Sequence, residues 1–216
     1  MGLSAEDVVR TVLARFGTTL ATDAGFRLEN EPASLFQLLV LAELVSARIA
    51  AETAVATAAE LRRAGWTTPA RLRDAPRSQL IAALGRGGYR RYDLRTAGQL
   101  TALAELVLAR YRGDLRRLAE EAEGDVDRAA VLLQEFPGIG PTGAAVFLRE
   151  VQAVWPWVRP FLDERARSGA ERVGLPADDA RLAALVPGND LARLAAGLAR
   201  VSRLRKGEEA LGDVVE

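Results

Sequence analysis

The stretch Leu133-Gln-Glu-Phe-Pro-Gly-Ile-Gly-Pro-Thr-Gly-Ala-Ala-Val-Phe-Leu148 predicts a helix, a tight turn and a second helix. Pro137 and Gly138 end the first helix, because proline cannot continue the hydrogen-bond ladder and glycine adopts the positive φ angles that a reversal needs. Pro141 suits the first turn of the next helix, where its missing N–H costs nothing. The apolar residues that follow predict that the second helix is buried.

The turn itself carries chemistry in its backbone. Unpaired N–H groups around Gly138, Ile139 and Gly140, at the N-terminus of a helix, predict a site for an anion. Glycine also lets a phosphate approach the main chain without a side chain in the way. An ordinary helix–helix turn can have the same composition, so spacing alone leaves both interpretations open.

The segment from Phe136 to Ala144 resembles the helix-hairpin-helix of the endonuclease III-like DNA glycosylases, the HhH-GPD superfamily. That family follows its hairpin with a Gly/Pro-rich loop and an essential aspartate. The loop here is Trp155-Pro-Trp-Val-Arg-Pro160, and the aspartate is Asp163. The loop before the aspartate is a couple of residues longer than is usual in the family.

Two flanking segments extend the resemblance. Ala170-Glu-Arg-Val-Gly-Leu175 is similar to the Ala-x-Arg-x-Gly-Leu end of the family's aspartate-led helix. Upstream, Pro32 to Arg48 resembles the family's early core helix. The resemblance therefore runs from about residue 33 to residue 176.

The resemblance implies an all-α fold of two helical lobes with a DNA-binding cleft between them. A middle lobe, residues 33–140, leads into the helix-hairpin-helix at about 126–151. Residues 1–32 and 152–216 form the second lobe, which carries the aspartate. Asp163 would stabilise the oxocarbenium-like sugar and activate water. An aspartate at a helix N-terminus can also be a cap and nothing more.

The hairpin also bears on the type of glycosylase. Family members that cut the DNA backbone use a hairpin lysine as a Schiff-base nucleophile, and that position is Thr142 here. We therefore expect a monofunctional DNA glycosylase that removes a damaged or mismatched base. The alternatives are a catalytically silent protein that binds damaged or bent DNA, and an all-α module whose hairpin packs against protein.

Further residues are candidates for DNA contacts. Gly138, Ile139, Gly140 and Thr142 would bind the backbone, together with three arginines of the glycine-rich segment 85–95. The carbonyls of Phe136 and Ile139 could hold a cation. The alternative for the three arginines is a solvated loop, and the alternative for the loop tryptophans is ordinary packing. The three arginines are Arg86, Arg90 and Arg91, and the candidates for a base pocket or a wedge are Arg48, Tyr89, Trp155 and Trp157.

Composition limits the chemistry. The 216 residues are 49% hydrophobic, enough for a substantial core. The chain has no Cys and no His, which excludes disulfides, the usual zinc sites and a Cys-ligated iron–sulfur cluster. We expect no cofactor. The 29 basic and 29 acidic residues balance, which counts against nucleic-acid binding unless the basic residues gather on one face.

The acidic start of the chain and the lack of a long apolar run lead us to expect a cytoplasmic protein that contacts no membrane. We also expect a monomer that binds double-stranded DNA. Strand-like alternation is missing throughout. Local sequence patterns predict a capping box at Ser4, an irregular linker from 17 to 32 and a cap at Asn189 or Asp190. The predicted helices are 33–63 with a break near 46–50, a short one from Pro69, 74–84, 96–111, 126–135, 164–173, 178–185 and 190–205.

Overall fold

A computed structural model describes residues 3–47, 49–90, 93–205 and 210–211. In these residues every regular element is a helix, which confirms the predicted all-α class. The contacts divide the chain into two units, Met1–Thr19 with Arg149–Glu216, and Leu20–Leu148. We call them the terminal unit and the central unit. No helix of the described residues is both long enough and apolar enough to cross a membrane.

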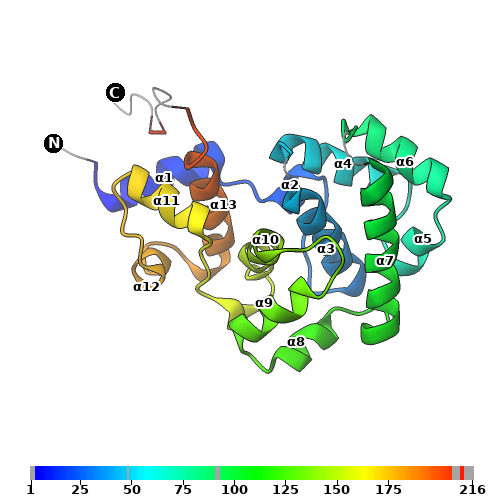
Figure 1. The fold of residues 1–216 in the computed structure, drawn as a ribbon. Coiled ribbons are helices and arrows are strands. Elements are labelled where there is room, and N and C mark those ends of the chain that lie inside the picture. The colour runs from blue at the N-terminus through cyan, green and yellow to red at the C-terminus, as the bar shows by residue number, and fades with distance from the viewer. Residues whose placement is uncertain (1–2, 48, 91–92, 206–209, 212–216) are drawn as a thin grey trace. The chain divides into compact units, whose positions relative to one another are not determined.

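The central unit is built around α3, Pro32–Ser46 (Figure 1). Eleven of its residues are buried, because it is apolar on all sides and neighbouring helices cover it. It packs against α2, α4 and α7. The other helices of the unit are α2 (Leu20–Asp23), α4 (Ala51–Arg63), α5 (Pro69–Arg73), α6 (Arg77–Arg86), α7 (Asp93–Tyr111), α8 (Arg116–Ala122) and α9 (Val126–Gln134); α10 (Pro141–Val151) begins there and ends in the terminal unit.

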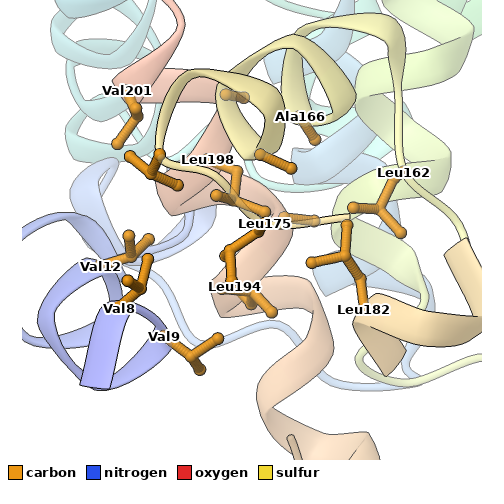
Figure 2. Packing of buried hydrophobic residues seen from close by; sticks show 14 of the residues in the cluster. Val8, Val9, Val12, Leu162, Ala166, Leu175, Leu182, Leu194, Leu198 and Val201 are labelled. Atoms are coloured by element: carbon orange, nitrogen blue, oxygen red, sulfur yellow. The ribbon is translucent and has the colours of Figure 1, made fainter. Parts of the chain in front are cut away.

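The terminal unit packs α1 (Ala5–Phe16) and α11 (Glu164–Arg172) against α13 (Leu191–Val201). Figure 2 shows the apolar side chains of these helices meeting in one cluster, with Leu162 and Leu182 at its edge. A Cβ at Gly169 of α11 would lie 1.9 Å from the carbonyl oxygen of Leu198, so this glycine lets α11 and α13 approach closely. The remaining elements are the short helices η1 (Pro156–Val158), α12 (Asp179–Ala183) and η2 (Gly188–Asp190).

Several predicted helix boundaries are confirmed. The Ser4 hydroxyl accepts a hydrogen bond from the Asp7 N–H at 3.2 Å, and the Thr68 hydroxyl accepts one from the Arg71 N–H at 3.4 Å. The expected break in the long alanine-rich stretch falls between α3 and α4. It falls there because Ala47 and Ala50 are extended.

Other boundaries were predicted wrongly. The expected irregular linker contains α2, whose Leu20 and Ala21 are buried. Of the two predicted caps, Asn189 and Asp190, the N-cap residue of α13 is Asp190, but its side chain makes no capping hydrogen bond and Oδ1 accepts from Arg193 Nη1 at 2.7 Å instead. The helix predicted from residue 74 is α6, and it begins at Arg77, because Pro76 precedes it as the cap residue. The last helix ends at Val201 and not at residue 205.

Candidate functional site

The hairpin joins α9 to α10 through a turn that requires glycine. Gly138 has φ +87°, which L-residues rarely adopt. A Cβ at this position would also lie 2.7 Å from Glu43 Oε1 and 3.2 Å from Gln99 Nε2. Backbone geometry and close packing therefore both disfavour a side chain at the tip of the turn.

The N-terminus of α10 presents free amides. The Ile139 N–H is not among them, because it donates to the Phe136 carbonyl at 3.0 Å. In the described part of the chain, no acceptor is found for the N–H groups of Gly140, Thr142 and Gly143. Unpaired N–H groups and the positive end of the helix dipole at one place favour an anion. Of the amides expected to bind phosphate, Gly140 and Thr142 are available and Ile139 is not.

Asp163 lies directly before α11 in the terminal unit and is its N-cap residue. Its Oδ1 accepts from the Ala166 N–H at 2.8 Å, and its Oδ2 accepts from Arg149 Nη1 at 2.5 Å. The pair is buried, with 7% of Asp163 and 4% of Arg149 exposed. A second buried carboxylate, Glu150, has its Oε1 3.6 Å from Arg149 Nη2. One arginine therefore lies between two acids.

The loop that leads to Asp163 is held by two side chains. Gln152, fully buried, donates to the carbonyls of Arg149 and Phe161 at 2.9 and 2.7 Å and accepts from the Phe161 N–H at 3.1 Å. Arg159 donates to the carbonyls of Gln152 and Ala153 at 2.5 and 2.8 Å. These bonds satisfy several backbone groups of the loop and hold the chain on the N-terminal side of Asp163.

The central unit contains a cavity of about 580 Å³ next to the hairpin. Its walls come from α3, the start of α7, the segment before α7, and the hairpin residues Gly138 to Gly140. Glu43 of α3 lines it and is only 3% exposed. Its Oε2 has no hydrogen-bond partner in the residues that the structure describes. Burial raises the pKa of Glu43 to about 8, although Arg95 opposes the shift.

Tyr89 also lines this cavity. Its hydroxyl accepts a hydrogen bond from Thr96 Oγ1 at 3.1 Å, and 2% of the residue is exposed. Burial raises the pKa of Tyr89 above its usual value of 10.0, so the phenol stays neutral. Tyr89, expected at a base pocket or a wedge, thus lies in the wall of a cavity and not on an open surface.

The basic residues expected at DNA lie in different settings. Arg86 Nε binds Glu60 Oε2 at 2.9 Å, which occupies it. Arg90 is exposed, and its side chain has no acidic partner among the described residues. Arg48 and Arg91 lie outside the described residues.

The two loop tryptophans form a pair. Trp155, 2% exposed, stacks on the partly buried Trp157 with ring centroids 5.5 Å apart. Phe136 is buried against Tyr111, and its carbonyl already accepts from Ile139. A cation at the carbonyls of Phe136 and Ile139 stays a prediction.

Reasoning from sequence missed Glu43, Arg149 and Gln152. All three are polar residues that interrupt buried apolar stretches of helix or follow them. Glu43 lies between Ala42 and Leu44, where the periodicity predicts a core position. A charged residue in such a position is rare unless it is paired or functional, which was the available signal.

Comparison with known proteins gives a similarity in structure only. No family model matches the chain, and no curated protein matches it. The structure is similar to a solved structure of endonuclease III trapped as a covalent intermediate with DNA, described as an estranged-adenine complex. The two are 18% identical, the match covers 91% of this chain and 85% of the other, and the TM-score is 0.48.

Proposed function

We propose that this protein is a monofunctional DNA glycosylase of base-excision repair. The observation that carries the proposal is the pairing, in one chain, of a glycine hairpin with free amides and an aspartate held at a helix N-terminus by Arg149. The hairpin amides of Gly140 and Thr142 bind a phosphate of double-stranded DNA. Asp163 then acts on the sugar of the target nucleotide.

The chemistry follows from the bond that breaks. Cleavage of an N-glycosidic bond leaves positive charge on the deoxyribose, which a carboxylate stabilises. Both oxygens of Asp163 accept hydrogen bonds, as those of a carboxylate do. The target base must first leave the stack. After the bond breaks, water oriented by Asp163 adds to the sugar and completes the hydrolysis. Thr142 replaces the lysine of the enzymes that also cut the backbone, so no Schiff base forms there.

A second candidate function is DNA binding without catalysis. One observation favours it: Asp163 is 7% exposed and both of its oxygens are occupied. A carboxylate that serves only as a cap and an ion-pair partner has this environment. The hairpin would still bind the DNA backbone.

Release of the base from labelled duplexes separates the two functions. The duplexes carry uracil, thymine in a mismatch, adenine opposite an oxidised guanine, or an alkylated purine. Asp163→Asn keeps the cap and should lower base release at least 100-fold while duplex binding is unchanged. Asp178→Asn is the matched control, because Asp178 caps α12 through the Arg181 N–H at 2.8 Å and should leave the rate unchanged.

The outcomes are distinct. Duplex binding by a protein that releases no base from any substrate supports the second candidate. Equal rates for Asp163→Asn and the parent protein refute a catalytic Asp163. Borohydride trapping on abasic DNA should give no covalent adduct, and efficient trapping at a position other than the N-terminal amine refutes the monofunctional mechanism.

A further inference from the structure

Asp163 carries a negative charge that its own surroundings offset. Arg149 Nη1 binds its Oδ2 at 2.5 Å, and the N-terminus of α11 adds the positive end of a helix dipole. The positive charge that develops on the sugar is stabilised by a net negative charge beside it. Because Asp163 and Arg149 alone would form a neutral pair, the proposed chemistry calls for another negative charge in this site.

Glu150 is in a position to supply that charge. It follows Arg149 directly at the end of α10, it is fully buried, and its Oε1 lies 3.6 Å from Arg149 Nη2. The guanidinium therefore faces one carboxylate through each of its two terminal nitrogens. Two carboxylates and one guanidinium give this group of three residues a net charge of −1.

The neighbouring charge pair leaves this balance unchanged. Arg167 follows Asp163 by one turn of α11 and is close enough to interact with it electrostatically. Asp179 binds Arg167 through two bonds of 2.9 Å, and these bonds are the main reason why the pKa of Arg167 is raised. Arg167 and Asp179 together thus add no net charge beside Asp163.

Stability does not explain why these charges are buried. Arg149 is 4% exposed, and its Nε has no hydrogen-bond partner among the residues that the structure describes. A buried donor without a partner lowers stability, and well-packed apolar side chains are often at least as favourable as a buried group of ions. Costly buried charges around a candidate catalytic aspartate point to a role in the reaction.

We propose that Glu150 is a positioning residue of the glycosylase reaction and that it acts through Arg149. Glu150 shares the charge of the guanidinium, so Arg149 holds Oδ2 of Asp163 in place without cancelling the negative charge that the sugar needs. Burial strengthens this effect, because charges interact more strongly where water is excluded. The inference rests on the proposed function, since it gives Glu150 a task in the chemistry of Asp163.

Single-turnover release of the base by the full chain tests this role, with the labelled duplex that the parent protein processes fastest. Glu150→Gln removes the charge and keeps the shape, so it should lower the rate constant by about tenfold or more. Duplex affinity should not change, because the buried side chain does not reach the DNA. Glu150→Asp keeps the charge and should recover most of the lost rate.

Further variants separate charge from structure. Glu171→Gln makes the same change of charge on the exposed side of α11 and, as the control, should behave as the parent protein. In an Arg149→Met background, Glu150→Gln should no longer lower the rate, because the charge through which Glu150 acts is gone. Thermal unfolding of each variant identifies a temperature at which the variants are folded, and the rates are compared there.

Equal rates for Glu150→Gln and the parent protein overturn the inference, as do equal losses in Glu150→Gln and Glu150→Asp or an undiminished loss in the Arg149→Met background. A Glu150→Gln protein that fails to fold assigns the charge to stability and also overturns it. In each of these cases Asp163→Asn can still abolish base release, and the proposed function stands. A parent protein that releases no base from any substrate overturns the proposed function, and this inference with it.

Discussion

Two Arg–Asp pairs in the terminal unit differ mainly in burial. Arg149 and Asp163 are almost completely enclosed, whereas the side chain of Arg167, paired with Asp179 through two bonds of 2.9 Å, is 48% exposed. Removal of one partner from a buried pair leaves an uncompensated charge in a poorly solvated site. At an exposed pair, water replaces the lost partner.

At the residue scale, we therefore expect unequal costs from the same substitution. Arg149→Met should lower the free energy of unfolding by about 3–5 kcal/mol at pH 7, because Asp163 and Glu150 lose their shared cation. Arg167→Met should cost about 1 kcal/mol or less. Urea unfolding of the two variants at pH 7 measures both values. Equal costs would contradict the assignment of Arg149 as the residue that holds Asp163.

The sequence predicted Asp163 as a helix cap but not its partner. Arg159 and Arg165 are nearer in the chain, yet Arg159 binds backbone carbonyls instead. Arg149 precedes Asp163 by 14 residues, and only the loop held by Gln152 brings them together. Such a contact depends on tertiary geometry, which local spacing does not contain.

At the element scale, the close approach of α11 to α13 depends on one glycine. Gly169 lies in the middle of α11, where alanine would be the better helix former. A Cβ at this position would meet backbone atoms of Leu198, at 1.9 Å from the oxygen and 2.6 Å from the carbon. Backbone atoms in a helix cannot move aside as a flexible side chain can, so the two helices would have to separate.

Gly169→Ala should therefore lower the free energy of unfolding by about 1–3 kcal/mol despite the gain in helix propensity. Gly98→Ala is the matched control in the middle of α7, where a Cβ would have its nearest neighbour at 3.9 Å. That variant should be more stable than the parent by up to about 1 kcal/mol. Thermal unfolding of both proteins checks the signs, and a stabilised Gly169→Ala would show that α11 does not pack as described.

Most elements were predictable because helix periodicity and caps are local. A few adjacent residues are enough to recognise the capping box at Ser4, the Thr68 cap before Pro69 and the start of α10 at Pro141. The short helix α2 was missed because four residues carry too little periodicity to recognise. Its burial comes from contacts with α3 and α4, which are not local.

At the scale of the whole molecule, charge is balanced and many arginines are already paired. The 29 basic and 29 acidic residues give no net attraction for DNA, so affinity depends on local features. Arg86 is occupied by Glu60, whereas Arg90 is exposed without an acidic partner in the described residues. Of these two, Arg90 is the one available to a phosphate.

Arg90→Gln should accordingly weaken duplex binding for all sequences and lower the slope of log affinity against log salt by about 1. Arg86→Gln should change the slope less, because its guanidinium is neutralised by Glu60 before DNA binds. Fluorescence anisotropy with a labelled duplex, at several salt concentrations, gives both slopes. A larger effect from Arg86→Gln would place the DNA backbone elsewhere on the central unit.

The all-α class was predictable from composition and periodicity, but the cavity was not. Its walls come from α3, α7 and the hairpin, segments separated by dozens of residues. The hairpin was found because its glycines and prolines lie within one short segment of the sequence. Glu43 was not found, because its environment depends on which residues surround it after folding.

The position of Gly138 against Glu43 has a consequence for the evolution of this chain. Because the acid fills the space that a Cβ at residue 138 would need, the two positions are not free to vary separately. Homologous chains that keep a large side chain at position 43 should keep glycine at position 138. Those that have shortened position 43 still face the positive φ of the turn, which asparagine tolerates better than other substitutes, so asparagine is the replacement to look for there.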